Sequence, residues 1–156
     1  TIDRLWDANL DRLNPKVDLD LDDDSWKIYC RSPAAAPHYI GSEAKVENSM
    51  ITEGCEIDGE IDYSVLFANV TVEEGAEVTY SIVMPGTVVK KGAKVRYSIV
   101  AENAVIDEGA QVGEKPENMA DIKDWGVTVI GSGVHIGKGA KVEPKVMADS
   151  DVGGEE

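Results

Sequence analysis

Residues that carry redox and metal chemistry are scarce in this chain. Its 156 residues include two cysteines, Cys30 and Cys55, and two histidines, His38 and His135. Two cysteines cannot build the disulfide framework of a small secreted domain, so we expect a cytoplasmic protein. Cys55 falls on a small, inward position of the repeat described below, where a thiol serves as a buried apolar side chain.

Positive charge and long apolar runs are also in short supply. Lysine and arginine total 15 against 30 aspartates and glutamates, which gives a net charge of −15 at pH 7. Such a surface repels a phosphate backbone, so we expect no nucleic-acid partner. We find no signal peptide and no apolar run long enough to span a membrane, and we expect no membrane partner. Because the chain starts at Thr1, we interpret it as an excised piece or a processed product.

The motifs of common enzymes are missing as well. The sequence has no glycine-rich phosphate loop, no serine nucleophile elbow and no cysteine pair with metal-ligand spacing. The aspartates at 22–24 could collect a cation through their carboxylates, but they lack the spacing of a calcium loop. They are more typical of a solvated acidic linker, so we predict no metal site and no cofactor in this chain.

What the chain does contain is an internal repeat. The segment VEEGAEVTYSIVMPGTV begins at Val72 and VKKGAKVRYSIVAENAV begins at Val89, a shift of 89 − 72 = 17 residues. A third copy, IDEGAQVG, begins at Ile106. A repeat of this kind indicates a solenoid, in which each copy forms one coil and buries its apolar residues against the next.

The spacing within a copy predicts a coil with three sides. Aliphatic anchors recur at steps of six, five and six residues, at Val72, Val78, Val83, Val89, Val95, Val100, Ile106 and Val112. We expect a second inward row four residues after most anchors, at Ala76, Ile82, Thr87, Ala93, Ile99, Ala104 and Ala110. Gly75, Gly92 and Gly109 recur where a tight corner needs a φ value that a β-carbon disfavours. Short strands stacked as a parallel β-helix satisfy this pattern.

The coils can be followed outward from the clear copies. Ile40 heads the first coil, and the coil headed by Ile57 is shorter than its neighbours because 72 − 57 = 15, so we expect a trim near Asp58 and Gly59. Residues 114–126 leave the pattern and predict a loop at a corner, a common place for function. Tyr80 and Tyr97 share one phase, which predicts an aromatic ladder more readily than a ligand platform.

The rest of the chain divides around the repeat. The first thirteen residues predict a short amphipathic helix with Ile2, Leu5, Trp6 and Leu13 on one face. We divide the chain into a helix and connector at 1–39, a β-helix at 40–147 with its loop at 114–126, and an acidic tail at 148–156 that we expect to be disordered. The helix and connector should cover one end of the solenoid. Because the other end needs a partner for its strand edges, we predict a homo-oligomer, a dimer or a tetramer.

Several hexapeptides resemble those of a known fold. IGSEAK at Ile40, IGSGVH at Ile130 and IGKGAK at Ile136 are similar to the repeats of left-handed β-helix proteins. The predicted fold class is therefore all-β: a left-handed parallel β-helix, or hexapeptide-repeat solenoid, preceded by the short amphipathic helix and connector. The left hand is implied by the resemblance.

Enzymes with this fold suggest one alternative function. Some hold zinc through three histidines between subunits, which this chain cannot supply. Others are acyltransferases that use a histidine as general base beside acyl-coenzyme A. His135 is the only candidate within the repeats, on an outward position with no carboxylate partner that the sequence assigns. It keeps open the alternative of a hexapeptide-repeat acyltransferase.

Longer segments carry a more specific resemblance. TIDRLWDANLDRL, DLDLDDDSWKIYCRSPAAAPHYIG, SMITEGCEIDGEIDYSVLF and SIVMPGTVV resemble the C-terminal region of bacterial glucose-1-phosphate adenylyltransferase (ADP-glucose pyrophosphorylase), from Thr1 to about Val142. The resemblance implies an enzyme whose N-terminal catalytic domain makes ADP-glucose and pyrophosphate from ATP and glucose 1-phosphate, with Mg²⁺, for glycogen synthesis. That domain is absent here, so no catalytic residue is expected, and the chain should be inactive alone.

The family also implies a role for the β-helix domain. It joins the subunits of the oligomer, contacts its own catalytic domain and contributes to the site of phosphorylated metabolite effectors. Arg96, in AKVRYSIV, and Lys123, in DIKDWGVTVI, match basic effector contacts of related enzymes, so we predict that both contact the effector. The acidic ending ADSDVGGEE departs from the basic segment with which enteric relatives help bind a sugar bisphosphate, which leaves the identity of the effector open.

Overall fold

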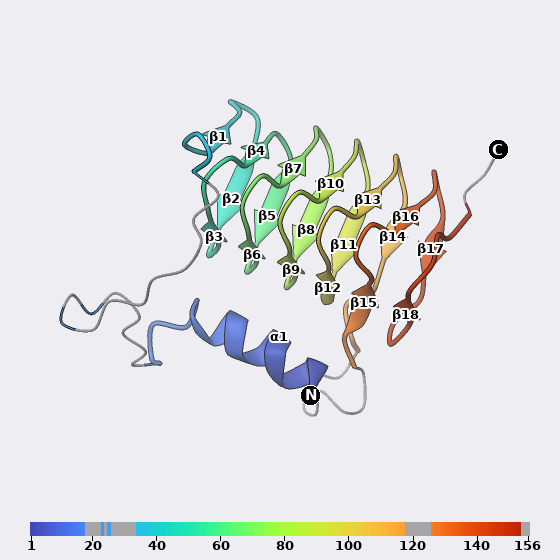
Figure 1. Ribbon diagram of the computed structural model, residues 1–156, viewed down its shortest axis with the longest axis horizontal. Helices are drawn as coiled ribbons and strands as arrows, with labels where there is room; N and C mark the ends of the chain where they lie inside the picture. The colour runs from blue at the N-terminus through green and yellow to red at the C-terminus, as the bar shows by residue number, and fades with distance from the viewer. Residues whose placement is uncertain (18–22, 24, 26–33, 118–125, 154–156) are drawn as a thin grey trace.

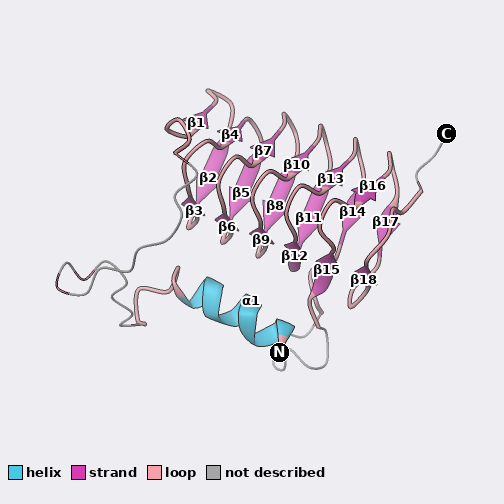
Figure 2. Cartoon of the chain, viewed as in Figure 1, coloured by secondary structure: helices cyan, strands magenta, loops and turns pink. Residues whose placement is uncertain are grey.

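Three parallel sheets wind into a solenoid of about six coils. The computed structural model describes residues 1–17, 23, 25, 34–117 and 126–153. Each sheet has six strands, and every strand pairs with the strand on the same side of the next coil (Figures 1 and 2). In register, Val72 lies beside Val89 and Val89 beside Ile106, which is the 17-residue repeat of the sequence. The predicted fold class is confirmed.

The strands are two or three residues long and fall into three sets. The first sheet contains β1 (Tyr39–Ile40), β4 (Glu56–Ile57), β7 (Thr71–Val72), β10 (Val88–Val89), β13 (Val105–Ile106) and β16 (His135–Ile136). The second contains β2 (Lys45–Glu47), β5 (Glu60–Asp62), β8 (Glu77–Thr79), β11 (Lys94–Arg96), β14 (Gln111–Val112) and β17 (Lys141–Val142). The third contains β3 (Met50–Ile51), β6 (Val65–Leu66), β9 (Ile82–Val83), β12 (Ser98–Val100), β15 (Thr128–Ile130) and β18 (Met147–Ala148).

The axis of the solenoid is filled by the predicted aliphatic columns. All the anchors from Val72 to Val112 are fully buried, and Cys55 is buried with them. The second inward row is confirmed on two sides of the coil, at Ala76, Thr87, Ala93, Ala104 and Ala110. On the third side the expectation is wrong. Ile82 and Ile99 are buried outside the axis, in a separate cluster beneath the helix.

Serines occupy the inward corner in place of those isoleucines. Ser64, Ser81 and Ser98 are fully buried, and each backbone N–H of Ser81 and Ser98 donates to the hydroxyl of the serine one coil earlier, at 3.1 and 3.2 Å. Each hydroxyl donates in turn to the carbonyl two residues before it, as Ser81 does to Thr79 at 2.8 Å. This ladder satisfies polar groups that burial would otherwise leave without partners.

Backbone geometry explains the corners and the shortened coil. Gly75, Gly92 and Gly109 have φ values of 72°, 69° and 67°, as the corner pattern predicted. The shortened coil narrows at Gly59, where a β-carbon would lie 2.5 Å from the carbonyl oxygen of Ala76. Only a residue without a side chain fits there, so the predicted trim is confirmed.

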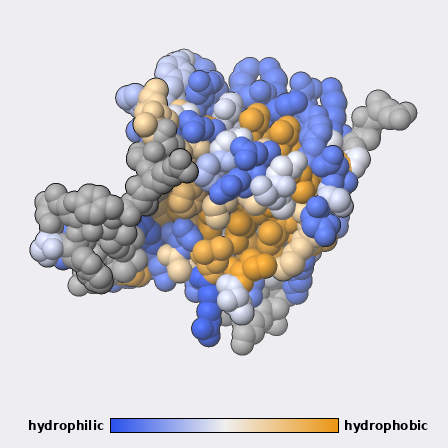
Figure 3. Space-filling model, viewed as in Figure 1, coloured by the Kyte–Doolittle hydropathy of each residue, from blue (hydrophilic) through white to orange (hydrophobic). Residues whose placement is uncertain are grey.

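The helix α1 (Ile2–Asp11) lies along the third sheet (Figure 1). Trp6 and Leu10 are buried and pack with Val65, Ile82 and Ile99. The predicted helical face is therefore only partly right, because Leu5 is 47% exposed and Leu10 is buried in its place. The expectation that the helix and connector cover one end of the solenoid is wrong for the helix, since its contacts are with the side of the stack. The described end of the connector does reach the first coil, where the Ala36 carbonyl accepts the backbone N–H of Gly54 at 2.6 Å. Figure 3 shows apolar surface gathered where solenoid and helix meet.

The chain continues its stacking beyond β18. Val152 forms a parallel bridge with Ile136, and the side chain of Asp151 accepts a hydrogen bond from the backbone of His135 at 2.8 Å. The expected disorder is wrong for these residues, because one apolar side chain and one carboxylate suffice to attach the segment. Residues 154–156 of the tail and residues 18–22, 24 and 26–33 of the predicted helix and connector region lie outside the described residues.

Candidate functional site

One hollow on the surface combines cations, carboxylates and aromatic rings. It has a volume of about 330 Å³ and lies where the second sheet turns toward the third. Three consecutive coils line it, together with the start of the predicted loop. Its residues are Asp62, Glu77, Thr79, Tyr80, Arg96, Tyr97 and Lys115. Of the two predicted effector contacts, the structure therefore places Arg96 in a hollow.

The guanidinium of Arg96 is held by a carboxylate from the neighbouring coil. Its Nε donates to Oε1 of Glu77 at 2.9 Å, and its Nη2 donates to Oε2 at 2.7 Å. Lys94 approaches the same carboxylate, with Nζ 3.9 Å from Oε2. Because β8 and β11 are adjacent strands in register, these side chains stand side by side on the sheet. Two parallel N–H···O bonds are the geometry by which arginine binds both carboxylates and phosphates.

This contact changes the acid–base behaviour of both groups. Hydrogen bonding from Arg96 holds the pKa of Glu77 below its ordinary value, although partial burial opposes the shift. The same bond raises the pKa of Arg96. Both groups are thus fully charged at neutral pH. About 30% of the Arg96 side chain and 27% of the Glu77 side chain remain exposed, so solvent reaches the pair.

Stacked tyrosines form one wall of the hollow. The rings of Tyr63 and Tyr80, and those of Tyr80 and Tyr97, have centroids 4.8 Å apart, so the predicted aromatic ladder is confirmed. These tyrosines have φ values of 46° to 48°, a backbone conformation that costs energy for a residue with a side chain. Trp6 stacks on Tyr97 at 6.3 Å and donates from Nε1 to the Tyr80 carbonyl at 2.8 Å. Helix α1 therefore packs against the tyrosines and holds them in place.

The loop at 114–126 contains two lysines, Lys115 and Lys123, and only Lys115 lies within the described residues. Lys123, the second predicted effector contact, lies outside the described residues. Lys115 is described, lines the hollow and forms no ion pair within the described part of the chain. Sequence reasoning missed Lys115. Its position two residues after Gly113, where the chain leaves the corner beside Arg96, was the available signal.

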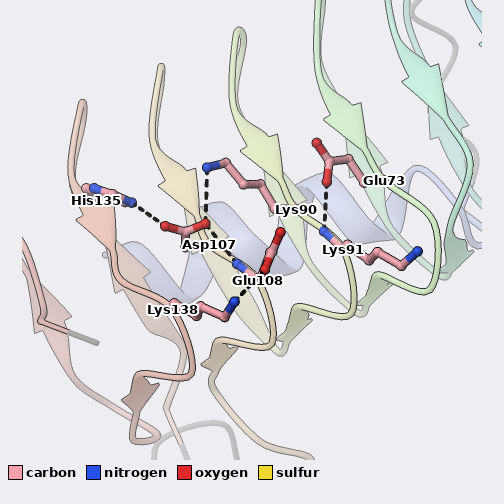
Figure 4. A network of polar contacts seen from close by, with 7 residues as sticks. All are labelled: Glu73, Lys90, Lys91, Asp107, Glu108, His135 and Lys138. Carbon is pink, nitrogen blue, oxygen red and sulfur yellow. Dashed lines mark hydrogen bonds and ion pairs between the residues drawn. The ribbon is translucent and has the colours of Figure 1, made fainter. Parts of the chain in front are cut away.

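A second polar group lies on the corner beside the first sheet, across three coils (Figure 4). The carboxylate of Asp107 is 3.1 Å from Nζ of Lys90 and 3.1 Å from Nε2 of His135, and it accepts the backbone N–H of Glu108 at 3.0 Å. Lys138 pairs with Glu108 at 2.8 Å. The sequence assigned no carboxylate partner to His135, and the structure supplies one, Asp107, from the preceding coil.

Asp107 is the fixed charge of this group. The backbone N–H of Glu108, followed by the Lys90 ammonium, lowers the pKa of Asp107 to about 2. A carboxylate that accepts from an imidazole can orient the ring and stabilise its charged form, as in general-base catalysis. The His135 side chain is 48% exposed, however, and is not among the residues that line the hollow around Arg96.

The described residues offer neither a metal site nor a membrane-spanning helix. No group of three or more His, Cys, Asp or Glu side chains is arranged there to hold a metal ion. Of residues 22–24, only Asp23 is described. Among the helices of that part of the chain, none has the length and apolarity to cross a membrane.

Comparison with known proteins places these features in context. The family model described as "GlmU-like, C-terminal hexapeptide" matches residues 33–134. Proteins named glucose-1-phosphate adenylyltransferase from Bacillus mycoides, Bacillus cereus and Bacillus anthracis are each 50% identical to the chain over 76 residues. That stretch is 49% of this chain and 20% of each relative, so the match spans about a fifth of their length.

Proposed function

This chain belongs to the GlmU-like, C-terminal hexapeptide family, and from that membership we propose that it is the regulatory and assembly part of a glucose-1-phosphate adenylyltransferase. The parent enzyme makes ADP-glucose and pyrophosphate from ATP and glucose 1-phosphate for glycogen synthesis. Its Mg²⁺ and ATP bind in a catalytic domain outside this chain. This chain binds a phosphorylated metabolite that tunes the enzyme, and it works in the cytoplasm.

The observation that carries the proposal is the hollow around Arg96. A guanidinium and the ammonium of Lys115 face one space beside stacked tyrosine rings. In a chain of net charge −15, most of the surface repels a phosphate, so an effector needs cations that converge from separate segments. Arg96 comes from strand β11, and Lys115 comes from the start of the loop at 114–126.

The regulatory proposal is tested by ligand-induced stabilisation. The melting temperature of the purified chain is measured with AMP, fructose phosphates, ADP-glucose and acetyl-coenzyme A. A ligand at about 100 times its Kd adds about 2.7 kcal/mol to the stability of the form that binds it. We expect at least one phosphorylated metabolite to raise the melting temperature, and Arg96→Gln to abolish that rise. Lys138→Gln, at an exposed ion pair away from the hollow, is the matched control. A flat response to all of the phosphates contradicts the proposal.

The first coil supports the assembly role. Its strands β1, β2 and β3 are the outermost strands of the three sheets among the described residues. Within these strands Tyr39 is 60% exposed, Ile40 40% and Met50 37%. Open strand edges flanked by apolar side chains favour pairing with another chain. We propose a homo-oligomer, a dimer or a tetramer, that also contacts its own catalytic domain. Light scattering that finds only monomer at high concentration contradicts this.

The absence of catalysis is tested directly. The chain incubated with ATP, glucose 1-phosphate and Mg²⁺ should form no ADP-glucose above a protein-free control. Formation of ADP-glucose that scales with the amount of chain would show that active-site residues lie within these 156 residues.

The contact between His135 and Asp107 favours a second candidate, a hexapeptide-repeat acyltransferase that uses acyl-coenzyme A. In that case the imidazole would accept the proton of an acceptor hydroxyl or amine. The two candidates predict different ligands in the melting experiment. Stabilisation by acetyl-coenzyme A that His135→Ala removes would support the acyltransferase, and stabilisation that depends on Arg96 would support the regulatory domain.

A further inference from the structure

Glu77 occupies the place at Arg96 that an anionic ligand would take. Its two oxygens meet Nε and Nη2 of the guanidinium at 2.9 and 2.7 Å, side on, as a phosphate or carboxylate of a ligand would. With Glu77 there, the hollow holds two cations, Arg96 and Lys115, and two anions, Glu77 and Asp62. Its charge is balanced, so an added anion gains little by entering.

A second partner for Glu77 lies on the same strand pair. Lys94 is in register with Glu77 across β8 and β11, and its Nζ is already 3.9 Å from Oε2. A small rotation of the Glu77 side chain would exchange Arg96 for Lys94, so the carboxylate would keep a cationic partner while Arg96 lost its own. The carboxylate thus has two alternative positions, and only one of them leaves Arg96 free.

We infer that Glu77 is an internal counter-ion that gates the hollow: a dianionic phosphate group binds Arg96 and Lys115 by displacing Glu77 toward Lys94. This inference rests on the proposed function, because it concerns the same effector hollow. An ion pair that solvent reaches is weak, and a ligand with two negative charges competes with it. A monoanion brings no more charge than the carboxylate it replaces. Glu77 therefore selects phosphate monoesters over monoanionic ligands.

The test uses the whole chain and inorganic phosphate as the probe. The Nε–H signal of Arg96 is followed by NMR during titration with phosphate, and sodium chloride at equal ionic strength is the reference. Removing a partly exposed carboxylate competitor frees the guanidinium, so Glu77→Gln should tighten phosphate binding about fivefold. Glu74→Gln is the matched control, because Glu74 lies on the same coil and pairs with the exposed Lys91 at 2.9 Å. It should leave the phosphate affinity at Arg96 unchanged.

Lys94 supplies a second, independent test. If Lys94 receives the displaced carboxylate, Lys94→Met should weaken phosphate binding in the parent chain and have little effect when Glu77 is already Gln. Equal losses in both backgrounds would show that Lys94 acts only through its own charge and would overturn the exchange.

The outcomes separate this inference from the proposed function. Equal phosphate affinity in the parent chain and in Glu77→Gln overturns the gate while the effector hollow stands. If the Arg96 signal responds to phosphate in neither protein, the effector hollow fails and the gate fails with it. Circular dichroism of each variant confirms that the solenoid is folded, since Gln has nearly the shape of Glu.

Discussion

Replacing Trp6 by alanine should release helix α1 from the solenoid. Trp6 is 6% exposed, stacks on Tyr97 and donates its indole N–H to the Tyr80 carbonyl at 2.8 Å. Trp to Ala changes at buried positions cost about 3 to 5 kcal/mol, and the lost hydrogen bond is included in that range at about 1 kcal/mol. Leu10 is the only other fully packed side chain of the helix, so most of the docking free energy is removed.

The loss should stay local. The helix has 10 residues, and helices of that length are marginal in water without tertiary contacts. The axial columns contain no residue of α1, so the solenoid should keep its own cooperative unfolding. At 1.4 kcal/mol for each factor of ten, about 4 kcal/mol corresponds to roughly 10³-fold faster amide exchange in the helix.

Hydrogen exchange measured by mass spectrometry resolves these two regions. The matched control is Leu5→Ala, because Leu5 is on the same helix and 47% exposed. Leu5→Ala should speed amide hydrogen exchange in the helix far less than Trp6→Ala does. Two results would refute the reasoning: helix protection that survives Trp6→Ala, or a loss of protection spread equally over helix and solenoid.

Three further changes probe the corners, the charges and the buried ladder. Gly113→Ala should lower the free energy of unfolding by several kcal/mol, because the added β-carbon would lie 2.1 Å from the Arg96 carbonyl oxygen. Gly92→Ala should cost about 1 kcal/mol, because its added β-carbon meets no atom within 4 Å. Urea unfolding that gives the two variants equal stability would contradict this. In the folded chain the pKa of Asp107 is lowered to about 2 from 3.8, so its carboxylate stabilises the fold at any pH above 3.8. That stabilisation is lost as the pH falls from 3.8 toward about 2. The stability gap between the parent chain and Asp107→Asn should therefore close between about pH 4 and about pH 2, and a constant gap would count against the assignment. Ser81→Ala should lower the free energy of unfolding by about 1 to 3 kcal/mol, because the buried backbone N–H of Ser98 loses its acceptor, the Ser81 hydroxyl. A variant as stable as the parent chain would show that this hydrogen bond does not stabilise the fold.

The solenoid could be predicted because similar residues recur at fixed intervals along the sequence. A step of 17 residues and glycine at one phase define coils and corners before any contact is known. The place of Ile82 and Ile99 could not be predicted in the same way. In the sequence, an aliphatic residue that faces the axis looks the same as one that faces a helix. Ile82 faces the helix because the neighbouring Ser81 takes the inward position, and only the structure shows this.

Contacts between coils were the part that spacing did not reveal. Arg96 was predicted as an effector contact because it matches a basic position of related enzymes, but its partner Glu77 is 19 residues away, on the preceding coil. His135 and Asp107 are 28 residues apart because a loop intervenes, so no fixed offset connects them. Pairs of this kind depend on register and on rotamers that the repeat leaves free.

The charged corner in Figure 4 has a consequence for how the chain avoids misfolding. The aliphatic interior looks alike from coil to coil and would tolerate a slip of a whole turn. Along this corner the charge alternates in sign from coil to coil, through Glu74, Lys91, Glu108 and Lys138. Glu74 pairs with Lys91, and Glu108 pairs with Lys138. Skipping a coil would set like charges against each other. The alternation gives otherwise interchangeable turns a serial order, so deleting one turn should be harder for this protein to accommodate than deleting two.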